Sequence, residues 1–162
     1  MKNGRLESAD RADSFGFGVR AIADGAWGFA ASQVVTADEA DRVAALAVEI
    51  AKASALTKMR DAALAPVEPK TATYSTPARV DPFAMTVDDR LGLLLAAEAK
   101  LRERKGLRTT RAAYSIWRED KLFLSTEGAD IQQRLTEVGG GIAAEVVGDG
   151  ELQIRTDRKT HV

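Results

Sequence analysis

The chain has 162 residues, of which 45% are hydrophobic and 29% charged, and this composition is typical of a folded globular protein of one domain. Its 23 Lys and Arg residues nearly balance 24 Asp and Glu residues, which argues against electrostatically driven binding to nucleic acid. The chain contains no apolar run long enough to cross a membrane, no secretory signal and no cysteine. We therefore expect a cytoplasmic protein without disulfides, thiol nucleophiles or cysteine-bound metals.

The first part of the chain predicts tight turns and a hairpin. Asn3-Gly4 is a strong turn signal, but no strand precedes it, so it indicates either a loose N-terminal loop or a chain that lacks its natural beginning. Alternation of apolar residues predicts a strand over 15–23. Asp24-Gly25 then predicts a second turn, and residues 27–31 return as the partner strand.

Two helices are predicted in the middle of the chain. Thr36 and Glu39 have the spacing of a capping box, and the apolar residues behind them predict a helix over 37–60 whose inner face carries Val43, Leu46, Ala47 and Ile50. Residues 70–74 fit a short edge strand between prolines. A second helix is predicted from Thr86, with cations in its last turn, Gly106 at its end and a leucine face formed by Leu91, Leu94, Leu95 and Leu101.

The last third of the chain predicts short strands joined by turns. We expect turns at Glu119-Asp120 and Glu127-Gly128, a break at 139–141, and a final turn at 148–150. The expected strands cover 112–117, 121–126, 129–138, 142–147 and 152–156. The predicted fold class is therefore α+β, with an antiparallel β-sheet (hairpin plus C-terminal meander) packed against two amphipathic helices.

No residue pattern indicates a catalytic, metal or cofactor site. Gly16, Gly18 and Ala21 match a dinucleotide fingerprint in letters, but they lie in a strand that ends in a hairpin. Ser125 has no histidine near it in sequence to activate it, and His161 alone cannot form a metal site. The acidic pairs Asp88-Asp89 and Glu119-Asp120 are explained by a helix start and a turn.

The densest group of aromatic residues surrounds the predicted hairpin and comprises Phe15, Phe17, Trp27 and Phe29. These side chains fit a sheet face packed under a helix. They also fit an exposed interface, or a channel wall that holds an extended peptide. The sequence leaves both interpretations open.

The run Gly16-Phe17-Gly18-Val19-Arg20-Ala21-Ile22-Ala23-Asp24-Gly25-Ala26-Trp27-Gly28-Phe29-Ala30 closely resembles the N-terminal signature of the TldD/PmbA family. The alanine-rich helix, Asp81-Pro82, the second helix and Ser125-Thr126-Glu127-Gly128 follow in the family's order. The resemblance implies a cytoplasmic zinc metallopeptidase, or its partner subunit, that forms homo- or heterodimers around a chamber for unfolded peptides. It places the zinc on a His-Glu-x-x-x-His helix and a cysteine of a C-terminal domain.

The resemblance implies that residues 1–162 form most of an N-terminal domain, truncated at both ends relative to the family. No position matches a catalytic or metal-binding residue, so we expect a non-catalytic portion, inactive alone, with zinc only in the missing C-terminal domain. The matched signature residues take structural roles: Gly16, Gly18, Arg20, Asp24, Gly25, Trp27, Gly28 and Phe29, with Trp27 and Phe29 expected to pack. The alternative is a free-standing peptide- or protein-binding module without enzymatic activity.

Overall fold

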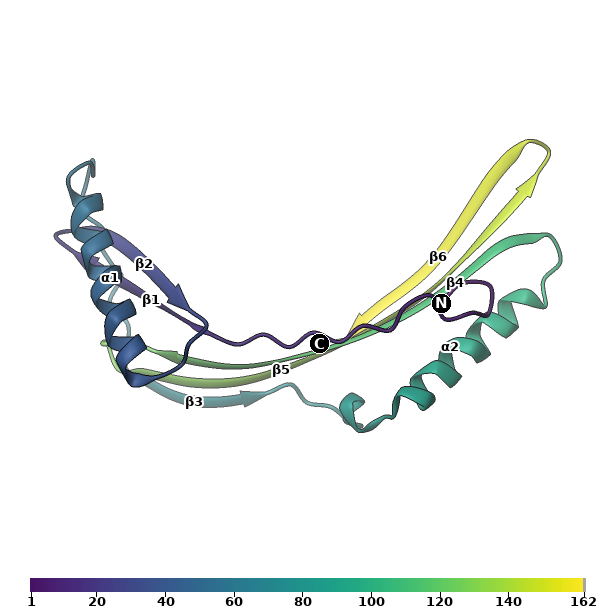
Figure 1. Ribbon diagram of the computed structural model, residues 1–162, viewed down its shortest axis with the longest axis horizontal. Helices are drawn as coiled ribbons and strands as arrows, with labels where there is room; N and C mark the ends of the chain where they lie inside the picture. The colour runs from purple at the N-terminus through teal and green to yellow at the C-terminus, as the bar shows by residue number, and fades with distance from the viewer. Residues whose placement is uncertain (162) are drawn as a thin grey trace. The chain divides into compact units, whose positions relative to one another are not determined.

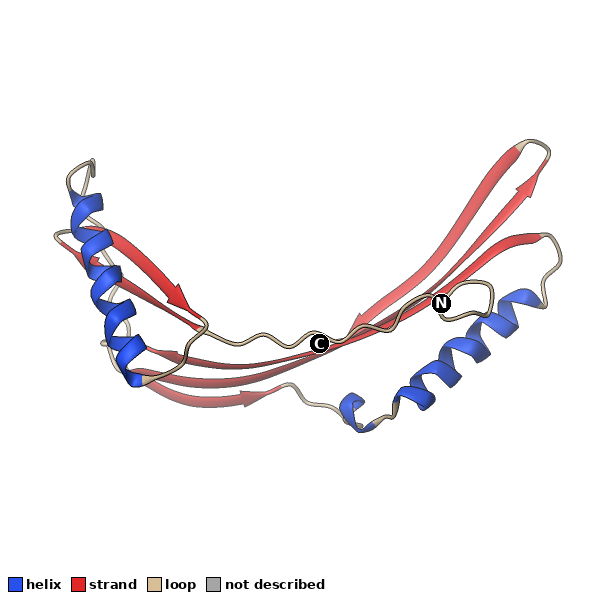
Figure 2. Ribbon diagram, viewed as in Figure 1, coloured by secondary structure: helices blue, strands red, loops and turns tan. Residues whose placement is uncertain are grey.

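The computed structural model describes the backbone of residues 1–161 and the side chains of residues 1–160 (Figures 1 and 2). The sequence predicts one domain, whereas the contacts divide the chain into two compact units. Unit 1 comprises Met1–Asp10 and Glu68–Val162, and unit 2 comprises Arg11–Val67. Within the described range, no helix is both long enough and apolar enough to cross a membrane.

Unit 2 is a β-hairpin covered on one face by a helix. Strands β1 (Phe17–Ala23) and β2 (Ala26–Ser32) pair antiparallel, as the sequence predicts. Asp24 and Gly25 form the turn between them, with φ angles of 49° and 71°. Two successive positive φ angles match the twist of a two-residue hairpin, and they explain the Asp-Gly pair at this point.

The core of unit 2 is built from small side chains. Helix α1 (Ala37–Ala55) buries Val43, Ala47 and Ala51 against the hairpin, where Ala30 is also buried. The predicted stripe is therefore partly wrong, because Leu46 and Ile50 are more than one-third exposed. The helix also ends earlier than expected, five residues before position 60.

The start of α1 is fixed by polar contacts. The Thr36 hydroxyl accepts a hydrogen bond from the backbone N–H of Glu39, which confirms the predicted cap. The Glu39 carboxylate pairs with Arg42 at 2.7 Å instead of reaching back to Thr36. The Arg42 guanidinium, helped by the Ser32 hydroxyl, lowers the pKa of Glu39 from its usual 4.5 to about 2.

Unit 1 is built on a mixed sheet around one central strand, β5 (Ala129–Gly148). The long strand β4 (Leu107–Leu124) pairs antiparallel along one edge of β5. The other edge carries two strands end to end: β3 (Lys70–Ser75), which is parallel to β5, and β6 (Glu151–His161), which is antiparallel (Figure 1). The α+β class is confirmed, and the parallel pairing of β3 is an addition that the sequence did not predict.

The predicted turn at Glu119-Asp120 is wrong, because β4 continues through it. Asp120 lies directly opposite Arg134 on β5, and their side chains form an ion pair at 2.6 Å. Glu119 pairs with Lys121 on its own strand at 3.0 Å. The acidic residues thus belong to a charged strand surface, and the chain reverses only at Ser125–Gly128, where Gly128 has a φ of 91°.

The predicted break at Gly139–Gly141 is also wrong. All three glycines keep their ladder partners on both β4 and β6. A Cβ on Gly139 would lie 2.8 Å from the Ser115 hydroxyl, and one on Gly141 would lie 2.9 Å from the Arg158 side chain. Gly139 and Gly141 therefore make room for side chains of the neighbouring strands, which is another role of glycine in a sheet.

Helix α2 (Val87–Arg102) packs on β4 and begins with a complete capping box between Thr86 and Asp89. Leu91, Leu94 and Leu101 are partly buried, whereas Leu95 is exposed, so the predicted leucine face is correct except at Leu95. Gly106 has a φ of 84° but follows the helix by four residues, and it shapes the loop into β4 rather than capping the helix.

The Asn3-Gly4 turn forms, with φ angles of 50° and 74°. Lys2 and Arg5 pair across it, and Lys2 also bridges to Arg111 on β4. The backbone N–H of Asn3 donates to the carbonyl oxygen of Thr110 at 3.0 Å. The N-terminal residues are therefore bound to the sheet of unit 1 and do not form the loose loop that was one of the two interpretations.

Candidate functional surface

The signature hairpin exposes the face that α1 does not cover. Residues of β2 alternate strictly, so Ala26, Gly28 and Ala30 are buried and Trp27 and Phe29 point outward. Trp27 is 44% exposed and Phe29 56% exposed. Neither side chain joins the core of unit 2, where Phe17 is the one of the four aromatics that packs against the core cluster. The expected packing role of Trp27 and Phe29 stays a prediction.

The exposed aromatic side chains form a defined surface with a cation. The Arg20 guanidinium lies 5.7 Å from the centre of the Trp27 ring, within cation–π range. A shallow hollow of about 450 Å³ is lined by Arg20, Trp27, Gly28, Phe29 and Ile50. Gly28 of β2 and Ile50 of α1 line the edge of the hollow, and we call Arg20, Trp27 and Phe29 the hairpin surface. Its combination of tryptophan, phenylalanine and arginine is enriched at protein interfaces.

Two signature glycines are required by close contacts. A Cβ on Gly28 would lie 1.9 Å from the carbonyl oxygen of Ala47 and 2.5 Å from the nitrogen of Ala51, so β2 lies directly on the backbone of α1 here. A Cβ on Gly18 would lie 2.7 Å from the Phe29 ring, which covers that position on the outer face. Gly28 thus fixes the helix below the hairpin, and Gly18 seats an aromatic side chain above it.

Gly16 and the turn residues are held by contacts at the two ends of the hairpin. A Cβ on Gly16 would lie 2.7 Å from the carbonyl oxygen of Ser32, at the open end. At the other end, Lys58 donates to the carbonyl oxygen of Asp24, and the N–H of Ala62 donates to that of Gly25 at 2.8 Å. The segment after α1 therefore holds the turn, and the open end leaves no room for a side chain at Gly16.

The other sequence candidates occupy structural positions. The Ser125 hydroxyl accepts from the backbone N–H of Ala129 at 3.3 Å, within the β4–β5 turn. Asp89 caps α2, and its hydrogen bonds with Thr86 lower its pKa below the usual range. The side chain of His161 lies outside the described residues. Among those that are described, no cluster of three or more His, Cys, Asp or Glu side chains could hold a metal ion.

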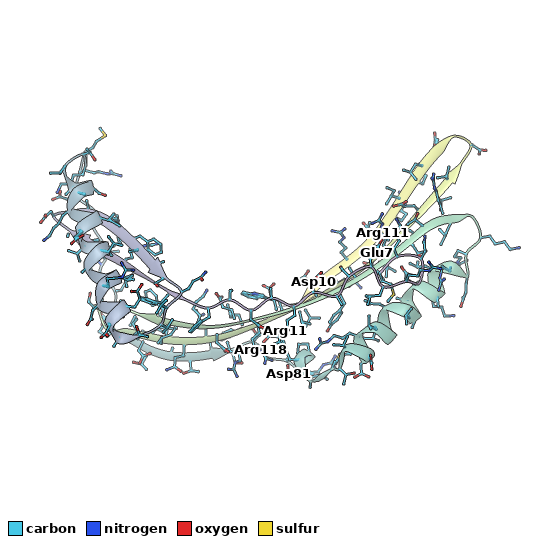
Figure 3. All side chains as sticks on the ribbon, viewed as in Figure 1. Glu7, Asp10, Arg11, Asp81, Arg111 and Arg118 are labelled. Atoms are coloured by element: carbon cyan, nitrogen blue, oxygen red, sulfur yellow. The ribbon has the colours of Figure 1, made fainter. Side chains whose placement is uncertain are left out.

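A polar cluster in unit 1 joins the Asp81 segment to the sheet (Figure 3). The Arg118 guanidinium on β4 pairs with Asp81 at 2.8 Å and lies 4.2 Å from the centre of the Phe83 ring. Phe83 belongs to the short 3-10 helix η1 (Pro82–Ala84). The Asp-Pro motif therefore anchors the chain entering α2, and the contact is structural.

Sequence reasoning missed two features near the end of α2. The first is Glu98, which is fully buried: its Oε2 accepts from the backbone N–H of Gly4, and its Oε1 has no hydrogen-bond partner. The second is a pocket of about 310 Å³ lined by Asn3, Arg102, Arg104, Leu107, Arg108, Thr109 and Thr110. The charge run of residues 100–111 was the available signal for the pocket, but it is equally typical of an ordinary helix end.

Comparison with known proteins assigns both units to one family. The family model described as "PmbA/TldA metallopeptidase domain 1" matches residues 1–51, and "PmbA/TldA metallopeptidase central domain" matches residues 80–159. The chain is 20% identical over 158 residues to a metalloprotease of Methanocaldococcus jannaschii, covering 98% of this chain and 35% of that protein.

Two solved structures share the fold. A Thermotoga maritima protein, described as a candidate modulator of a DNA gyrase, matches 99% of this chain and 35% of its own, with a TM-score of 0.74 and 16% identity. TldE from Thermococcus kodakarensis matches 87% of this chain and 32% of its own, with a TM-score of 0.60 and 17% identity. The chain thus spans about a third of the length of these relatives.

Proposed function

This chain belongs to the TldD/PmbA family and corresponds to the N-terminal part of the family's proteins. We propose that it forms the non-catalytic portion of a cytoplasmic zinc metallopeptidase of that family. The carrying observation is that two consecutive domain models of the family match in order over residues 1–51 and 80–159. The proposed role of the chain is to form the wall of a chamber for unfolded peptides and to supply contacts between subunits.

The proposed chemistry belongs to residues outside this chain. A zinc ion held by His-Glu-x-x-x-His and a cysteine in such a segment would supply an activated water for peptide hydrolysis, and the glutamate of the motif would serve as general base. The present sequence contains neither that motif nor any cysteine. The proposed contribution of the 162 residues is therefore structural: unit 2 supplies a hairpin backed by a helix, and unit 1 supplies a long sheet.

The test begins with the DNA that flanks this reading frame. We expect it to encode a downstream His-Glu-x-x-x-His and a later cysteine, and we expect the complete product to hydrolyse unstructured peptides in a zinc-dependent, chelator-sensitive way. The 162-residue chain alone is the control and should show no hydrolysis. Peptide hydrolysis by the isolated chain, lost on chelation, would contradict the proposal, as would a complete product that is inactive with zinc and lacks an active partner subunit.

The hairpin surface supports the proposed subunit contact and gives a specific prediction. Trp27→Ser in the complete product should weaken subunit association by roughly tenfold or more, because an exposed aromatic beside Arg20 is the kind of residue that dominates interface energies. Sedimentation equilibrium measures this change. Trp117→Ser is the matched control, since Trp117 on β4 is 47% exposed. An equal effect of both substitutions, or none from Trp27→Ser, would remove the hairpin surface from the interface.

A further inference from the structure

The arginines at the end of α2 converge on one pocket in unit 1. Arg102 ends the helix, Arg104 lies in the following loop, and Arg108 is the second residue of β4, yet all three line the same 310 Å³ pocket. Three positive charges repel one another when they are brought together. Such convergence needs a balancing negative charge, and none of the lining residues is acidic.

The nearby carboxylates are directed elsewhere. Residues 100–111 contain six Lys and Arg residues and one acid, Glu103. Glu103 pairs with Lys100 at 3.0 Å, and the buried Glu98 accepts from Gly4. Within the described part of the chain, no ion pair involves Arg102, Arg104 or Arg108. The dipole of α2 accounts for cations in its last turn, but not for Arg108, which lies on a strand.

The remaining lining groups are also suited to an anion. The Asn3 side-chain carbonyl oxygen accepts from the backbone N–H of Thr110 at 2.8 Å, which fixes the side chain and leaves its NH₂ group as a donor. The Arg102 guanidinium packs on Gly4, where a Cβ would lie 2.6 Å from Nη2, so the turn holds this arginine in place. The pocket is therefore rich in donors: Thr110 fixes the Asn3 side chain, and the Arg102 guanidinium lies against the N-terminal turn.

We propose that this pocket binds a phosphoryl group, either free phosphate or the phosphate of a small phosphomonoester. Guanidinium groups match the oxygens of phosphate with paired hydrogen bonds, and several arginines around one concave site are typical of phosphate recognition. The concave arrangement favours a compact anion over a polymer, because a nucleic-acid surface presents its cations along an extended stripe.

The test titrates inorganic phosphate into the 162-residue chain by calorimetry at fixed ionic strength, with chloride as the balancing salt. We expect saturable binding at one site. Arg104→Gln combined with Arg108→Gln should weaken it by about tenfold or more, whereas Lys105→Gln, a cation of the same loop outside the pocket lining, should change it by less than about twofold. Circular dichroism checks that each variant is folded.

A second arm of the experiment uses O-phosphoserine. Binding as tight as that of phosphate would assign the pocket to a phosphomonoester, and binding of inorganic phosphate alone would assign it to the free anion. Equal losses in Lys105→Gln and the double variant would overturn the proposal by showing general charge attraction. It would also be overturned if phosphate bound no better than chloride, or if duplex DNA bound while phosphate did not.

Discussion

Gly28→Ala is expected to lower the free energy of unfolding of unit 2 by about 3 kcal/mol. The added methyl group would meet the carbonyl oxygen of Ala47 at 1.9 Å and the nitrogen of Ala51 at 2.5 Å. Both are backbone atoms of α1, so no rotamer change can relieve the contact and the whole helix has to move. That movement separates Val43 and Ala47 from the hairpin, and they form the core of the unit.

Urea unfolding followed by the fluorescence of Trp27 measures this effect, in a Trp117→Phe background that leaves one tryptophan. Gly92→Ala is the control, and because Gly92 lies in unit 1 it is followed by the fluorescence of Trp117 in a Trp27→Phe background. Gly92 is an exposed position inside α2, and a methyl group added there would have no atom within 4 Å, so alanine should stabilise unit 1 by about 0.5–1 kcal/mol through helix propensity. If the Gly28→Ala variant has the same free energy of unfolding as the unchanged chain, β2 and α1 are not in backbone contact.

Glu98→Ala is expected to lower the free energy of unfolding of unit 1 by about 3 kcal/mol. The Glu98 side chain is fully buried, and its Oε2 is the acceptor for the N–H of Gly4. Alanine leaves that N–H without a partner and opens a cavity between α2 and the N-terminal turn. Glu98→Gln keeps an acceptor oxygen for the N–H of Gly4 and places its NH₂ group where Oε1 has no hydrogen-bond partner.

The comparison of the two variants isolates the hydrogen bond from the charge. Glu98→Gln should lose less stability than Glu98→Ala, because it keeps the acceptor for Gly4 and the side-chain volume, and hydrogen exchange at Gly4 should be faster only in Glu98→Ala. Trp117 fluorescence in a Trp27→Phe background follows the unfolding of unit 1. If Glu98→Gln is as damaging as Glu98→Ala, the hydrogen bond to Gly4 and the side-chain volume do not account for the stabilisation, and the argument from burial is wrong.

Local sequence signals predicted the turns and helix starts well. The Asp24-Gly25 turn and the Thr86–Asp89 capping box depend on contacts within four residues, so the local sequence was sufficient to predict them. The same local patterns failed at Glu119-Asp120 and at Gly139–Gly141. There the structure depends on residues across the sheet, such as Arg134 opposite Asp120, and the register that brings them together is not encoded locally.

The candidate sites also divide into features that local sequence indicates and features that depend on distant residues. The glycine-aromatic run of the sequence indicated the hairpin and its aromatic residues. It did not indicate which face of the hairpin α1 covers. The local pattern therefore favours packing of Trp27 and Phe29, although Gly28 and Ala30 take the buried positions. The pocket of Arg102, Arg104 and Arg108 was hidden for another reason. Asn3 and Thr110 both line this pocket, although 107 residues separate them in the sequence. Only the folded unit brings these residues together.

The pairing of the Asn3 turn with β4 has a consequence for the order of folding. Strands β4, β5 and β6 are joined by tight turns, so they can zip together through contacts close in sequence. The Asn3–Thr110 contacts close a loop of 107 residues that contains all of unit 2. Loop closure of that length is entropically costly and slow, so the N-terminal turn should dock last. In that order, the arginine pocket is completed only in the final step of assembly.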